Sequence, residues 1–89
     1  MSDFYATLGA GLLLLVNAYE QKTLADATAK LDASPKTVKF VGILSKNNDM
    51  LKNLHTCLSG LRAMRNDEDF AGWRTQVKPL VNYAKQAYQ

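Results

Sequence analysis

Apolar residues occupy consecutive positions in one stretch near the start of the chain. Residues 8–19 read LGAGLLLLVNAY, and every position from Leu12 to Val16 is leucine or valine. A helix turns by about 100° per residue, so these side chains point in all directions around its axis. A helix that is apolar all round has to be enclosed by other helices, by a second copy of the chain or by lipid. The pattern therefore predicts a central N-terminal helix from Asp3 to about Glu20, covered on every side.

The residues that follow this helix leave two interpretations open. Residues 23–26, TLAD, resemble a capping box with aspartate in place of the usual glutamate. Either a new helix starts there and runs to Leu31 after a bend at residues 21 and 22, or one long N-terminal helix continues through them.

Ser34 followed by Pro35 is the clearest helix start in the chain, because proline suits the first helical position. We expect this helix to reach about Lys46. A strand is the competing prediction, since the segment is rich in β-branched residues, but no second strand is evident to pair with it. The expected buried residues are Val38, Val41 and either Ile43 or Leu44, with Phe40 near the boundary.

The second half of the chain predicts two longer helices. The first ends near Arg65 and carries an apolar seam with spacings of three, four and three residues: Leu51, Leu54, Leu58 and Leu61. Residues 66–69, NDED, place acidic side chains where the dipole of a new helix favours them. Pro79 falls inside that last helix, so we expect a kink or a break there. Residues 1–89 are thus predicted to form a single all-α domain, a compact bundle of four to five helices.

Small residues make the N-terminal helix thin on one side. Glycine costs about 1 kcal/mol relative to alanine in a helix interior, so Gly9 and Gly11 need a reason to be there. One interpretation is close packing against another helix of the same chain, and the other is a tight seam between copies. We expect a homodimer or higher oligomer, with these candidate self-association residues: Ala6, Gly9, Ala10, Leu13 and Leu14.

Composition and charge limit which cellular compartment and which class of partner the sequence suits. The 89 residues are 47% hydrophobic and 21% charged, as in ordinary globular domains, and the net charge of +3 permits an anionic partner without requiring one. A single cysteine excludes an internal disulfide and suits a reducing compartment. The N-terminus lacks the basic region of a signal peptide, and the apolar run is about half the length of a transmembrane helix. We therefore expect a cytoplasmic protein without a transmembrane segment.

The residues that carry chemistry are too few for an enzyme or a metal site. His55 and Cys57 are two positions apart on a helix, so they point in different directions and cannot form a nucleophilic pair. We expect Cys57 to be a small core residue and His55 a boundary residue. Residues 67–69, DED, are expected to cap a helix. The sequence therefore predicts no catalysis, no metal and no cofactor.

Binding is the remaining class, and three hypotheses fit it. The favoured one is a small interaction protein that binds a protein partner stoichiometrically, as inhibitors, immunity proteins and phage accessory proteins do. The second is an oligomeric binder of an anionic nucleotide or nucleic acid, in which a basic face with an aromatic side chain contacts phosphates and a base. The third is a structural subunit of a capsid or filament. A solvated polar face is the simpler interpretation of the candidate anion-binding residues: Arg62, Arg65, Arg74, Lys78, Tyr83 and Lys85.

Overall fold

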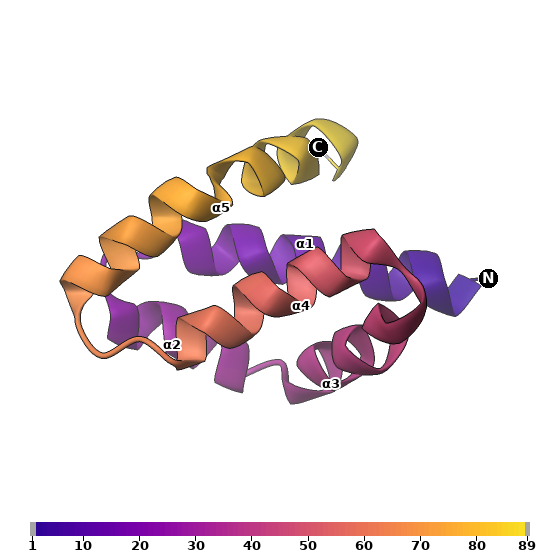
Figure 1. Cartoon of the computed structure of the whole chain (residues 1–89), viewed down its shortest axis with the longest axis horizontal. Helices are drawn as coiled ribbons and strands as arrows, with labels where there is room; N and C mark the ends of the chain where they lie inside the picture. Colours follow the sequence, from indigo (N-terminus) through magenta and orange to yellow (C-terminus); the bar gives the residue numbers. More distant parts are fainter. Residues whose placement is uncertain (1, 89) are drawn as a thin grey trace.

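The chain is helical along almost its whole length. The computed structural model describes residues 2–88, with side chains for residues 3–87, and this part contains five α-helices, one short 3-10 helix and no strand. The elements are α1 (Ser2–Tyr19), α2 (Leu24–Asp32), α3 (Pro35–Leu44), η1 (Ser45–Asn47), α4 (Asp49–Arg62) and α5 (Asp67–Tyr88). In Figure 1, α1 lies behind α4 and α5, and α2 and α3 follow the lower edge. The predicted all-α bundle is confirmed.

Helix α1 is covered on most of its circumference, but not on all of it. It contacts each of the other four α-helices. Leu12 and Leu15 are completely buried, and Leu14 and Val16 nearly so, whereas Leu13 is 48% exposed. The single chain therefore does not enclose the face centred on Leu13, and cover of that face by a second copy stays a prediction. The physical reason is size, since so short a chain buries only about 60% of its unfolded surface.

The helix boundaries follow the local capping signals, with some shifts. The first helix does stop and restart, and the Thr23 hydroxyl accepts a hydrogen bond of 3.2 Å from the Asp26 amide at the start of α2. The amide of Leu24, also at that start, donates to a carboxylate oxygen of Asp67 from the start of α5, at 2.9 Å. Helix α3 ends at Leu44, slightly earlier than expected, and α4 ends at Arg62 rather than near Arg65.

Helix α5 runs through Pro79 without a break. The alternative of an interruption there is therefore wrong, while Figure 1 shows the axis of α5 changing direction between its orange and yellow parts, as a proline kink would produce. The helix keeps one buried side before and after the proline, with Trp73 and Val77 on one part and Val81 on the other. The indole Nε1 of Trp73 donates to the Cys57 carbonyl at 2.8 Å, which joins α5 to α4.

The predicted leucine seam of α4 is the inner wall of the bundle. All of its residues have no exposed surface: Leu51, Leu54, Leu58 and Leu61. Gly11 lets α1 approach this wall closely, because a Cβ there would lie 2.6 Å from Leu54 Cδ2 and 2.9 Å from Val41 Cγ2. Close packing within the chain is thus the role of Gly11.

Alanine at Gly11 and at Gly72 should change the stability in opposite directions. At Gly11 the added methyl group meets two fully buried side chains, and overpacking outweighs the gain in helix propensity, for a net loss of about 1 kcal/mol. At Gly72 no atom lies within 4 Å of the new Cβ, so Gly72→Ala should stabilise the protein by about 0.5–1 kcal/mol. Urea unfolding monitored by circular dichroism measures both, and equal signs would contradict the packing described here.

Aspartate at Leu15 and at Leu13 should distinguish the buried side of α1 from its exposed side. Leu15→Asp buries an unpaired charge and should cost about 4 kcal/mol or more, close to the whole stability of a small domain. Leu13→Asp exposes its carboxylate to water and should cost less than about 1 kcal/mol. Thermal melting of the two variants checks this, and two similar melting temperatures would show that the orientation of α1 is wrong.

Candidate functional site

The large apolar side chains that are exposed belong mainly to α1 and α3. Of the five large hydrophobic residues that the described part of the chain exposes, four belong to α1 and α3 and one, Tyr83, to α5. Phe40 and Ile43 on α3 are each 49% exposed. They share cavity linings with Ala6 and Ala10 of α1, which together with Leu13 form the exposed row of that helix. We define the α1–α3 face by these residues: Ala6, Ala10, Leu13, Phe40 and Ile43.

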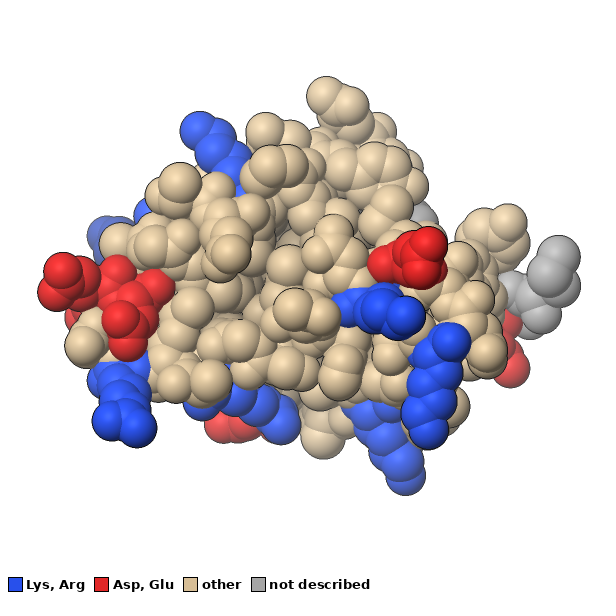
Figure 2. All heavy atoms as spheres, in the orientation of Figure 1, with Lys and Arg blue, Asp and Glu red and all other residues tan. Residues whose placement is uncertain are grey.

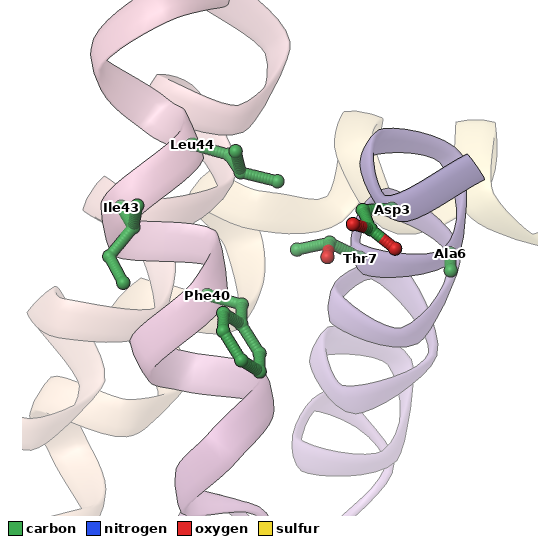
Figure 3. Close-up of a pocket in the computed structure, with 6 residues that line it drawn as sticks. All are labelled: Asp3, Ala6, Thr7, Phe40, Ile43 and Leu44. Carbon is green, nitrogen blue, oxygen red and sulfur yellow. The ribbon is translucent and has the colours of Figure 1, made fainter. Parts of the chain in front are cut away.

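The α1–α3 face is hollowed between its two helices. A cavity of about 380 Å³ is lined by residues of α1 and α3, and a smaller one of about 160 Å³ adjoins it along Ala6, Thr7 and Phe40. Figure 3 shows Phe40 and Leu44 projecting from α3 toward α1, with Thr7 projecting back from α1. We call the two cavities together the groove. The lining of the larger one is Asp3, Ala6, Thr7, Phe40, Ile43 and Leu44.

The groove results from the sequences of the two helices. Val41 faces inward and is completely buried, so the outer side of α3 carries Phe40 and Ile43. Opposite them, α1 presents alanines at positions 6 and 10, which are too small to fill the space. The groove is therefore the consequence of bulky side chains on one helix facing small ones on the other.

The predicted self-association residues do not all lie on this surface. Ala6, Ala10 and Leu13 are exposed there, and Gly9 is half-buried. Leu14 is only 6% exposed and belongs to the core, so its assignment to a contact surface is wrong. A step of one residue along a helix turns the side chain by about 100°, which is enough to separate Leu13 from Leu14.

Two of the predicted anion-binding residues contact the end of α1. The Nε of Arg74 donates to the Tyr19 carbonyl at 2.8 Å, and its guanidinium lies 4.6 Å from the centre of the Tyr19 ring. Lys85 lies 3.9 Å from a carboxylate oxygen of Glu20. Positive side chains at this place stabilise the carboxyl end of a helix. Arg74 and Lys85 therefore have a structural use within the chain.

Of the other anion-binding candidates, Lys78 lies with Arg74 and Lys85, whereas Tyr83, Arg62 and Arg65 do not. Tyr83 follows Arg74 by nine residues in the continuous helix α5, and at about 100° per residue this places it half a turn away. Tyr83, the expected aromatic neighbour, therefore lies on the opposite flank of α5. Arg62 pairs with Asp32 of α2 at 3.4 Å, and the Arg65 side chain is exposed near the start of α5. Lys78 is exposed beside Arg74.

The charges seen in Figure 2 are scattered in the same way. Lys and Arg side chains lie at several separate places on the face shown, and acidic side chains gather at the end where α5 begins. The basic residues of α5, Arg74, Lys78 and Lys85, thus share one flank of that helix, but Tyr83 lies on the opposite flank.

The residues with reactive side chains also have structural roles. His55 is half-buried, and its Nε2 lies 3.3 Å from the Ser59 hydroxyl. Burial raises the pKa of the half-buried Cys57 thiol and so disfavours the reactive thiolate. The Asn66 side chain caps α5, because its Oδ1 accepts a hydrogen bond of 2.8 Å from the Asp69 amide. Asp67 accepts from the Leu24 amide at the start of α2, and Asp69 from the Arg65 amide. Among residues 2–88, no cluster of acidic, histidine or cysteine side chains could hold a metal ion.

No buried side-chain nitrogen or oxygen atom among the described residues lacks a hydrogen-bond partner. None of their helices has the length and hydropathy needed to cross a bilayer.

Sequence reasoning missed the most exposed part of the groove. Of the alternatives Ile43 and Leu44, the structure packs Leu44 against the core and leaves Ile43 49% exposed. Phe40, expected near the boundary, is also 49% exposed. A signal for both was present, because Lys36 and Lys39 lie on the same side of the helix as these residues. Lysines at one-turn spacing from Phe40 and Ile43 indicate the outer side of α3.

Removing the Arg74 side-chain charge should destabilise the fold, while the same change at Lys78 should not. Arg74→Met loses a charged hydrogen bond and a cation–π contact with Tyr19, for an expected cost of about 1–2 kcal/mol. Lys78→Met, on the same flank of α5, removes an exposed charge and should change the stability by less than about 0.5 kcal/mol. Urea unfolding compares the two, and an unchanged midpoint for Arg74→Met would leave Arg74 free to bind an anion.

Comparison with known proteins adds no family to this description. The chain matches no protein-family model, no curated protein and no solved structure. The case for a function therefore depends on the α1–α3 face and on the contacts of the charged residues described above.

Proposed function

We propose that this protein acts by binding another protein stoichiometrically, through the α1–α3 face and without catalysis. The main support for this proposal is the exposed apolar groove. There Phe40 and Ile43 are half-exposed to solvent beside the small residues of α1. Contiguous apolar surface with polar surroundings is typical of protein-binding sites. Binding of this kind would block or escort the partner, as inhibitors do.

The contacts of the basic residues favour this function over the binding of an anionic ligand. Arg62, Arg74 and Lys85 each contact another part of the same chain, and Tyr83 is turned away from Arg74. A phosphate-binding surface needs several free cations on one side. At the groove, by contrast, the apolar side chains of Phe40 and Ile43 are each 49% exposed, because no other part of the described chain covers them.

Self-association is the competing use of the same face. A homodimer or a filament subunit would cover Leu13, Phe40 and Ile43 with a second copy. Light scattering of the purified chain at about 100 µM distinguishes this case. A monomer there favours a different protein as the partner, and a dimer that Phe40→Asp dissociates would replace the proposal by self-association.

Affinity capture with matched variants should identify a protein that depends on the face. The bait is the intact chain, incubated with lysate of the cells that produce it, in three forms: unaltered, Phe40→Asp and Tyr83→Asp. Both substitutions place a carboxylate at an exposed aromatic position, 49% exposed on α3 and 43% exposed on α5. We expect Phe40→Asp to lose a partner that Tyr83→Asp retains, with at least about a tenfold loss of affinity when the purified pair is titrated.

The titration also has to give one binding site per chain. Equal loss with both variants, or no protein that distinguishes them, would contradict the proposal. Circular dichroism of the baits confirms that each variant is folded.

A further inference from the structure

The charges beside the groove are almost all of one sign. Lys36 lines its smaller cavity, and Lys39 is exposed one residue before Phe40 and four before Ile43. Lys46 is exposed on η1, three residues after Ile43. The acidic residue of the lining is Asp3. In Figure 2, basic side chains project at the edge of the molecule where α3 lies.

These lysines are available to a partner. Neither salt bridge within the described residues involves Lys36, Lys39 or Lys46, in contrast to Arg62 and Lys85. Unpaired cations at the rim of an apolar surface attract a partner of opposite charge and raise the rate of its association.

The form of the groove indicates a helix as the segment that enters it. Its walls are helices whose backbone groups are already paired, and the described residues contain no strand that could add a strand from a partner. The exposed row of α1 from Ala6 to Leu13 is about 10 Å long, the length of two helical turns. Alanines at positions 6 and 10 would let the backbone of a third helix approach α1 closely.

From these observations we infer that the α1–α3 face binds an acidic amphipathic helix of a partner protein, an inference that rests on the proposed protein-binding function. Apolar residues at positions i, i+4 and i+7 of that helix enter the groove between Phe40 and the alanines of α1. Carboxylates on its flanks pair with Lys36 and Lys39. The partner helix thus completes the cover that α1 lacks.

A second copy of the chain and a lipid surface fit these observations less well. Aromatic side chains bury about 150–250 Å² each, so the three half-exposed large residues of the face, one of them aromatic, offer on the order of 300 Å². A stable dimer needs roughly 800 Å² per partner, and a two-fold pairing would also bring the lysines of both copies together. A lipid surface is flat, whereas this apolar surface is recessed between two helices.

Selection from a display library of helical peptides tests the inference directly. The immobilised target is the intact chain, and peptides that also bind Phe40→Asp are removed. We expect the remaining peptides to have a net negative charge and apolar residues at i, i+4 and i+7, and to retain their affinity for Tyr83→Asp. Their affinity, measured by fluorescence anisotropy, should fall about five- to tenfold with Lys36→Glu plus Lys39→Glu, and also when salt rises from about 50 to 300 mM.

The other outcomes separate this inference from the proposed function. Peptides that need Phe40 but are neutral or basic, or that tolerate the double lysine variant, would overturn the acidic helix and leave protein binding intact. The absence of any peptide that needs Phe40 would contradict both. Sedimentation with phosphatidylserine vesicles that Phe40→Asp abolishes would assign the face to a membrane, and a concentration-dependent dimer that Phe40→Asp dissociates would assign it to a second copy.

Discussion

The fold depends on covering one helix whose apolar side chains point in nearly every direction. Helix α1 would not be stable with its leucine side chains exposed to water, so the rest of the chain packs around it. Gly11 allows the leucine seam of α4 and Val41 of α3 to pack close to it, and α5 holds its carboxyl end through Arg74 and Lys85. The other four helices do not complete the cover, and the gap lies at Leu13.

This incomplete cover links the packing of the chain to its proposed function. The open side of α1 lies beside the groove against α3, and its residues are small where α3 is bulky. A partner that fills the groove would bury Phe40 and Ile43 and would add its binding free energy to the stability of the fold. Lysines at the rim would select the sign of the partner's charge, while the apolar residues supply most of the affinity. Folding and recognition would thus use the same helix, on different sides.

Features set by neighbours along the chain were predictable from the sequence, and features set by tertiary contacts were not. The helix start at Pro35, the leucine seam of α4 and the start of α5 at its Asn66 cap follow from spacing and local hydrogen bonding. The exposure of Leu13 was not predictable, because it depends on how many helices reach α1. The contact of Arg74 with Tyr19 joins residues 55 positions apart, and no local pattern encodes it. The apolar half of the candidate site was therefore found only in part, through Ala6, Ala10 and Leu13.

Within one chain, α1 is covered everywhere except on the side that carries Leu13. Methyl NMR with a soluble paramagnetic probe measures this directly, because the probe broadens only the signals of methyl groups that it can approach. In dilute protein we expect strong broadening for Leu13 and for Ile43, and none for Leu12 or Leu15. Protection of Leu13 equal to that of Leu12, or broadening of all the leucines of α1, would contradict it.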